Sequence, residues 1–157
     1  MRRRNATNRL LPHYERYLGP FSGDGVFEPE WNAPFSALRW RGGIEPDVDV
    51  VATLGVGRHL LNGRRQEFLI ALRSVWEDVA LPILASTGAY VVDRHAPLEI
   101  QEAIAIPREL GTPADALVVA SADALVQGLG LCREYVPPIE VLWLVPRTAR
   151  DRFDLGQ

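Results

Sequence analysis

The sequence is poor in the side chains that bind transition metals. It has one cysteine, Cys132, and three histidines among 157 residues. A single cysteine excludes an internal disulfide and any zinc site built from several thiolates. His13, His59 and His95 lie too far apart in the sequence to have the short spacing of a metal-binding pair. The composition therefore offers no ready metal site, and it fits a reducing compartment.

Long apolar runs and an excess of positive charge are also missing. No apolar run reaches the ~18 residues that a membrane span needs, and the basic residues 2–4 lead into polar Asn5 and Thr7, unlike a signal peptide. With 17 basic and 20 acidic residues the formal net charge is −3. Such a chain lacks the positive field that draws proteins to nucleic acid. We expect a cytoplasmic protein that binds neither membrane nor nucleic acid.

The length and the apolar content predict one globular domain. The hydrophobic fraction is 47% and the charged fraction is 24%, which is typical of folded domains. A chain of this length buries roughly 70% of the surface that its unfolded form exposes. We therefore treat residues 1–157 as a single domain.

The N-terminal half predicts a helix followed by strands. Apolar residues recur at helical spacing over residues 10–18, with Thr7 placed to cap this helix and Gly19-Pro20 to end it. Residues 20–46 are rich in glycine, proline and aromatic residues, which favours irregular chain or short strands. Residues 47–54 alternate between polar and apolar side chains, as in a strand that is covered on one face.

The stretch TLGVGRHLLNGRR, residues 53–65, is best interpreted as part of an antiparallel hairpin. Gly55-Val56-Gly57 lacks the third glycine and the following helix of a dinucleotide-binding loop. Asn62-Gly63 suits the positive φ angles of a type I′ turn. The turn lies between the strand at 47–54 and a second apolar run at 68–72. The glycines are therefore expected to reverse the chain and not to bind a cofactor.

The C-terminal half alternates between helix and strand without regular βαβ units. Ser74 and Glu77 have capping-box spacing, and a break at Pro82 leaves a main helix from about Pro82 to Asp93. Strands are predicted at 99–106, 115–120 and 139–145, the last one central and ended by Pro146, with a helical turn at 121–127 and a closing helix from Thr148. This order predicts an α+β fold with a mostly antiparallel mixed sheet and helices packed on it.

Three alternating carboxylates give the strongest indication of an enzyme in this sequence. Glu45, Asp47 and Asp49 would lie on one face at the entrance to a strand, and divalent metals prefer such oxygens. The alternative function is therefore a metal-dependent phosphodiester or glycosyl enzyme that uses Asp47 and Asp49. The competing interpretation is a solvated strand edge. Because no nucleophile and base pair and no GxSxG motif occur, we expect no catalytic residue, no metal and no cofactor.

Two surfaces are candidates for binding a partner. Arg58, His59, Arg64 and Arg65 place a basic cluster on the hairpin, which either contacts a partner or keeps the loop soluble. The aromatic residues between 27 and 40 either dock on a neighbouring subunit or fill the edge of the core.

The order of these segments resembles the suppressor of fused-like domain family. The segment DVDVVATLGVGRHLLNGRRQEFLIAL matches a family strand, turn and strand, with Thr53, Leu54, Gly55 and Glu67 in corresponding places. VWEDVALPILASTGAYV resembles the family's central helix, PADALVVAS a strand, and EVLWLVPRTARDRF its closing strand and helix. The resemblance covers residues 47–153. The family's usual Met-Ser is Val56-Gly57 in this chain, its Ile is Arg147 and its Glu is Asp151.

The resemblance implies a protein-binding module. Animal relatives hold a transcription factor inactive by gripping a peptide, and bacterial relatives are commonly immunity proteins that neutralise polymorphic toxins by direct contact. No enzymatic activity, cofactor or established site residue comes with the family. The expected partner is therefore another protein, such as a toxin.

Overall fold

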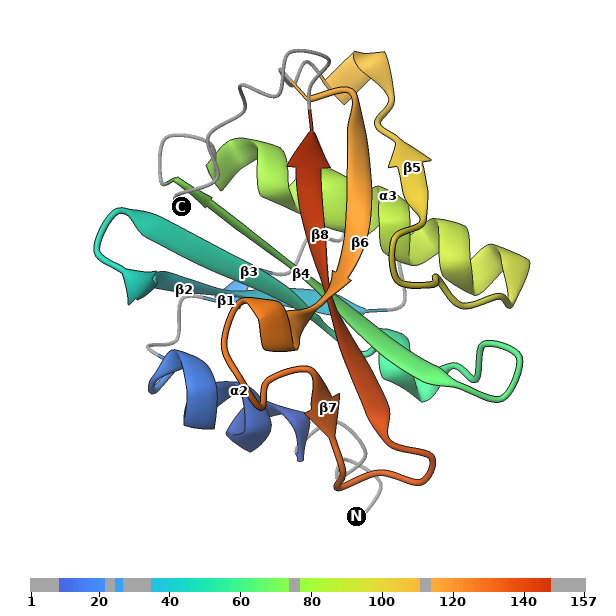
Figure 1. The fold of residues 1–157 in the computed structure, drawn as a ribbon, viewed down its shortest axis with the longest axis horizontal. Helices are drawn as coiled ribbons and strands as arrows, with labels where there is room; N and C mark the ends of the chain where they lie inside the picture. The colour runs from blue at the N-terminus through green and yellow to red at the C-terminus, as the bar shows by residue number, and fades with distance from the viewer. Residues whose placement is uncertain (1–8, 22–24, 27–34, 74–76, 111–113, 148–157) are drawn as a thin grey trace.

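A mixed sheet with one helix on each face forms the core of the molecule (Figure 1). The computed structural model describes residues 9–21, 25–26, 35–73, 77–110 and 114–147. Within them the strands are β1 (Gly25–Val26), β2 (Ser36–Glu45), β3 (Val48–Leu54), β4 (Arg65–Arg73), β5 (Ala103–Ala105), β6 (Ala116–Ser121), β7 (Leu131–Cys132) and β8 (Ile139–Arg147), and the helices are α2 (Leu10–Leu18) and α3 (Glu77–Arg94).

The strand order is β1-β2-β3-β4-β8-β6-β5, and β7 pairs with one end of β8. The pair of β4 with β8 is parallel, and the other pairs are antiparallel. This confirms the predicted α+β class with a mostly antiparallel mixed sheet. It also confirms that the most apolar strand, β8, is central, since it contacts β4, β6 and β7.

Both faces of the sheet are buried, which corrects the prediction that β3 is covered on one face only. Val50 of β3 belongs to the cluster under α2, while its neighbour Val51 belongs to the cluster under α3. Because successive side chains of a strand point to opposite faces, the two helices must lie on opposite sides of the sheet. The predicted helix over 10–18 is confirmed as α2, whose Leu10, Tyr14 and Leu18 are buried.

Residues 20–46 contain the ten-residue strand β2, so the prediction of irregular chain or short strands is wrong for much of this segment. The strand tolerates its glycines because its register with β3 shifts between Trp40 and Glu45, and Gly42 has a φ of +63° in the shifted part. A bulge of this kind needs a residue that adopts positive φ. Phe35 and Trp40 are buried in the core, whereas Phe27 and Trp31 lie outside the described residues.

Helix α3 runs without interruption through Pro82, so the predicted break is wrong. Proline removes one backbone hydrogen bond, at a cost of about 3 kcal/mol in a helix interior. The next residues, Ile83 and Leu84, are buried against the sheet, and each such side chain contributes roughly 1.5–3 kcal/mol on burial. Packing therefore offsets the lost hydrogen bond.

The remaining boundaries differ in detail. The strand predicted at 99–106 is only Ala103–Ala105, β7 was not predicted, and β8 continues through Pro146 to Arg147. The strand at 115–120 is confirmed as β6, and the turn at 121–127 contains a 3-10 turn at Ala122–Ala124. The cap by Thr7, the capping box at Ser74 and the closing helix from Thr148 fall outside the described residues.

A glycine allows α3 to lie flat on the core. Gly88 is buried, and a Cβ built there would come within 2.3 Å of Cζ of the Phe35 ring. The ring of Phe35 is itself buried and cannot move away without disturbing its neighbours.

We predict that Gly88→Ala lowers the free energy of unfolding by about 1–3 kcal/mol, the cost of overpacking a core. The loss should occur although alanine favours helix over glycine by about 1 kcal/mol. Urea unfolding measures the change. Ser86→Ala, at an exposed position of the same helix, is the control and should shift stability by less than about 0.5 kcal/mol. Equal stability of the Gly88→Ala protein and the natural chain would contradict this packing.

Candidate functional site

The stretch at 53–65 connects β3 to its antiparallel neighbour β4, as the hairpin prediction requires. The connection has two parts. A 3-10 turn, Val56–Arg58, comes first, and a smaller turn follows in which Leu61 and Arg64 exchange backbone hydrogen bonds of 2.7 and 3.1 Å. Asn62 and Gly63 lie between these two residues and have φ angles of 53° and 85°. A type I′ turn requires positive φ at both central positions.

The amides of the GxG segment surround a carboxylate of the chain itself. Glu67 of β4 is 1% exposed, and its Oε2 accepts hydrogen bonds from the backbone N–H of Gly55 at 3.0 Å and of Gly57 at 2.8 Å. Its Oε1 accepts a hydrogen bond of 2.6 Å from the hydroxyl of Thr53. A Cβ on Gly57 would lie 3.0 Å from Oε2 of Glu67, so glycine permits the close approach. The glycine amides thus bind a carboxyl group of the chain itself.

Burial governs the protonation of this carboxylate. Desolvation raises the pKa of Glu67 to about 7, against the lowering effect of the hydrogen bonds from Thr53, Gly57 and Gly55. The surroundings are fixed by further contacts: the Tyr14 hydroxyl donates to the Thr53 carbonyl at 2.7 Å, and the Phe68 N–H donates to the Thr53 hydroxyl at 2.9 Å. The sequence resemblance matched Thr53, Gly55 and Glu67 to family positions but did not predict this contact. A lone acidic residue beside the apolar run at 68–72 was the available signal.

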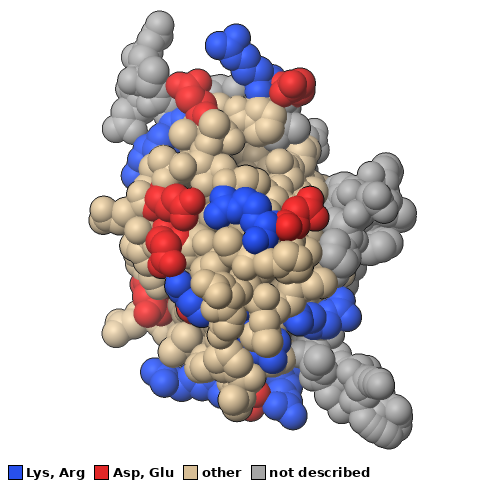
Figure 2. Space-filling view, turned by 90° about the vertical axis from the view of Figure 1, so that its right-hand side faces the viewer, with Lys and Arg blue, Asp and Glu red and all other residues tan. Residues whose placement is uncertain are grey.

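The four basic candidates on the hairpin differ in their surroundings. Arg64 donates to both carboxylate oxygens of Glu140, at 3.0 and 2.8 Å, and to Glu99 at 2.7 Å. Arg65 donates to the Gly57 carbonyl at 2.9 Å and is partly buried. Arg58 is exposed and His59 is half-buried. Acidic side chains lie beside basic ones on the face drawn in Figure 2, so positive charge does not dominate it.

The three acidic candidates do not form one face, which corrects the predicted alternation. Glu45 ends β2, Asp47 lies in the following turn, and both are exposed. Asp49 is in β3 and only 3% exposed, and its Oδ1 accepts a hydrogen bond from the Gly42 N–H at 3.2 Å. The tight turn between β2 and β3 places the three residues in different elements. Within the described ranges no group of three His, Cys, Asp or Glu side chains has a metal-binding arrangement.

An apolar groove lies between α3 and β5. It has a volume of about 360 Å³ and is lined by Ile83 and Tyr90 of α3, Ile104 of β5 and Leu117 of β6. Tyr90 is 42% exposed, and the Arg94 guanidinium lies 4.4 Å from the centre of its ring. An apolar groove with an exposed aromatic side chain suits a peptide or protein side chain.

Strand β5 borders this groove and lies at the edge of the sheet, at the end of the strand order. The Ile106 N–H donates to the Asp115 carbonyl at 2.9 Å, so even-numbered residues of this segment face β6. Hydrogen-bonding direction alternates along an antiparallel strand, and the backbone groups of Ala103 and Ala105 therefore point away from β6. Both alanines are exposed. Sequence reasoning predicted a strand here but gave no sign that it is an edge.

Comparisons with known proteins identify the fold. No family model matches the sequence, and no curated protein does either. The crystal structure of a protein named as a SUFU (suppressor of fused protein) homologue from Neisseria gonorrhoeae FA 1090 superposes with a TM-score of 0.56 and 18% identity, over 93% of this chain and 79% of that one. The Sufu-Fu complex crystal structure gives a TM-score of 0.64 and 13% identity, over 94% and 75%.

These likenesses confirm that the chain has the suppressor of fused-like fold. At such identities they show the fold and not a shared activity. The resemblance proposed for residues 47–153 extends at the level of fold to nearly the whole chain. In the described part, no helix is long and apolar enough to cross a membrane.

The buried carboxylate predicts a pH dependence of stability. The pKa of Glu67 is about 7 in the folded chain against an ordinary value of 4.5. As pH rises, the unfolded chain therefore loses the Glu67 proton at a lower pH than the folded chain does. The Glu67 contribution to the unfolding free energy falls by about 3 kcal/mol between pH 4.5 and pH 7. Glu67→Gln should abolish this part of the profile, which urea unfolding at a series of pH values measures as the difference between the two proteins.

Glu109→Gln, at an exposed position, is the matched control and should leave the pH profile unchanged. A Glu67→Gln protein whose stability followed the same pH profile as the natural chain would show that the Glu67 carboxyl does not titrate in this range.

Proposed function

We propose that the chain is a cytoplasmic, non-enzymatic protein-binding module and that it serves as a bacterial immunity protein, neutralising a polymorphic toxin by direct contact. The observation that carries the binding role is the exposed edge strand β5 beside the apolar groove of α3. The toxin-neutralising role is supported by the sequence resemblance to the suppressor of fused-like family, whose bacterial relatives are commonly immunity proteins. A bacterial SUFU homologue shares the fold.

The edge of β5 can accept an extended segment of the partner. Outward N–H and C=O groups of Ala103 and Ala105 would pair with the backbone of that segment, as in other cases of strand addition. Backbone pairing is independent of sequence, so specificity must come from side chains. Alternate side chains of the added segment would enter the groove between α3 and β5, where Ile83 and Ile104 offer apolar contacts.

Tyr90 is the residue expected to contribute most to affinity on α3. Its ring lies at the groove, and Arg94 holds it through a cation–π contact and a hydrogen bond to its hydroxyl. A ring that is already held in place loses little conformational entropy on binding. Tyrosine and arginine are also enriched among the residues that dominate binding energy.

The proposal is supported further by a likeness in architecture. One of the superposed structures, the Sufu-Fu complex, contains a protein partner. A suppressor of fused-like domain is thus compatible with function through contact between proteins, and the present chain offers a described surface for such a contact.

The test is growth rescue combined with binding. Co-expression with the toxic protein encoded beside its gene should restore growth, and the two proteins should co-purify as a complex. Ala105→Pro removes one outward N–H and should weaken binding at least tenfold, since proline cannot donate to an added strand. Ala105→Ser keeps the N–H and should bind as the natural chain does. Calorimetry measures both affinities.

Two results would contradict the proposal. If no neighbouring gene product is toxic or bound, the immunity role is wrong. If Ala105→Pro and Ala105→Ser bind a partner equally well, the interface lies elsewhere. Circular dichroism of both variants shows whether each has retained the fold.

A further inference from the structure

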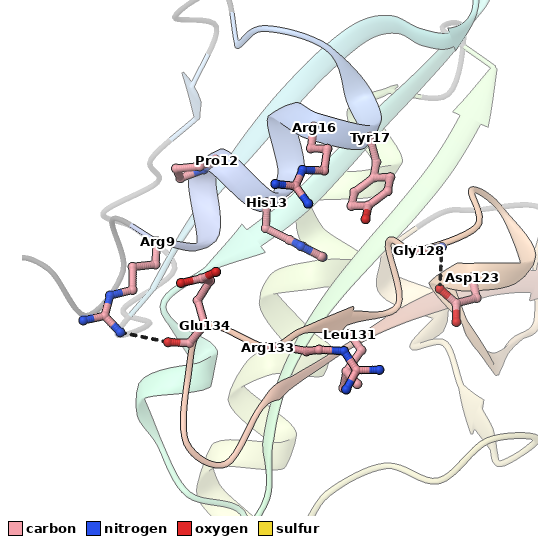
Figure 3. Close-up of a pocket in the computed structure, with 10 residues that line it drawn as sticks. All are labelled: Arg9, Pro12, His13, Arg16, Tyr17, Asp123, Gly128, Leu131, Arg133 and Glu134. Atoms are coloured by element: carbon pink, nitrogen blue, oxygen red, sulfur yellow. Dashed lines mark hydrogen bonds between the residues drawn. The ribbon is translucent and has the colours of Figure 1, made fainter.

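A second hollow lies on the face of the sheet that carries α2. This cleft has a volume of about 520 Å³. Figure 3 shows Arg9, the residue before α2, with His13 and Arg16 of α2 on one side of it, and Asp123 and Arg133 on the segment that faces the helix. It is separate from the groove of α3, since α2 and α3 cover opposite faces of the sheet.

The walls of the cleft are preformed. Gly128 has a φ of +97°, and a Cβ built there would come within 2.7 Å of the Tyr17 ring, so this part of the facing segment lies directly against the helix. His13 Nε2 contacts the Leu129 carbonyl at 2.9 Å and so joins the same two elements. Because a carbonyl only accepts, Nε2 carries the proton. Because these contacts already hold the walls in place, little conformational entropy is lost when a ligand binds.

Arginine dominates the charge of the lining. Three guanidinium groups, of Arg9, Arg16 and Arg133, face two carboxylates, of Asp123 and Glu134. Asp123 is already engaged, because its Oδ1 accepts hydrogen bonds from the N–H groups of Gly128 at 3.0 Å and Gly130 at 2.8 Å.

The guanidinium groups differ in what they already contact. Arg9 donates to the Glu134 backbone carbonyl at 2.8 Å. Neither Arg16 nor Arg133 forms an ion pair within the described residues, and both are exposed. Burial lowers the pKa of His13, so near neutral pH the positive charge comes from the arginines. Two guanidinium groups are therefore available to a ligand.

We propose that this cleft binds a small dianion, a phosphate ester or a dicarboxylate. Guanidinium groups form paired hydrogen bonds with both kinds of oxyanion. The volume lies within the range of small-molecule sites, and the cleft walls concentrate the field of the arginines. This site is independent of the proposed contact at β5, and either can fail without the other.

The experiment is thermal unfolding with glycerol 3-phosphate or succinate, at an ionic strength held constant with sodium chloride. A ligand at ten times its Kd should raise Tm by about 3–6 °C. Arg16→Gln and Arg133→Gln should each reduce the affinity about tenfold. Arg108→Gln, an exposed arginine outside the cleft, removes the same charge and should leave the affinity unchanged.

The two ligands distinguish the sources of the anion. A saturable rise in Tm with glycerol 3-phosphate alone assigns the site to phosphate esters, and a rise with succinate alone assigns it to dicarboxylates. No rise with either ligand would overturn the proposal. So would an equal rise in the Arg16→Gln and Arg133→Gln proteins, because the anion would then bind elsewhere.

Discussion

The contact between the Glu67 carboxylate and the amides of Gly55 and Gly57 is the constraint on which the hairpin depends. It joins β4 to the loop after β3, and the hydroxyl of Thr53 closes the same set of hydrogen bonds. Tyr14 links α2 to this set through the Thr53 carbonyl. A buried carboxylate is costly unless donors surround it, so the path of the loop and the position of the acid determine each other.

Because the Glu67 carboxyl occupies that loop and a helix covers each face of the sheet, partners and ligands are expected to bind at the edge of the sheet or beside the helices. The described structure offers two such surfaces. One is the edge of β5 with the apolar groove beside α3, which suits an extended protein segment. The other is the arginine-lined cleft beside α2. They lie on opposite faces, so one molecule has room for a protein partner and a small anion together.

The sequence correctly predicted those features that depend on residues close together in the chain. Helical spacing identified residues 10–18, and Asn62-Gly63 identified a turn, since both depend on neighbours a few residues apart. Pro82 misled because tertiary packing outweighed the missing hydrogen bond. The acidic residue beside the apolar run at 68–72 was a signal for the Glu67 contact, which joins residues 10 and 12 positions apart. The edge at β5 and the cleft could not be predicted, since each depends on elements far apart in the sequence.

The most direct test of the central interaction is an NMR titration of the side-chain carboxyl carbon of Glu67, with the amide protons of Gly55 and Gly57 followed in the same samples. The account predicts a midpoint near pH 7. Both amide protons should move downfield as the carboxylate forms and strengthens their hydrogen bonds. A midpoint near the ordinary value of 4.5, with amide shifts that do not follow it, would contradict the account.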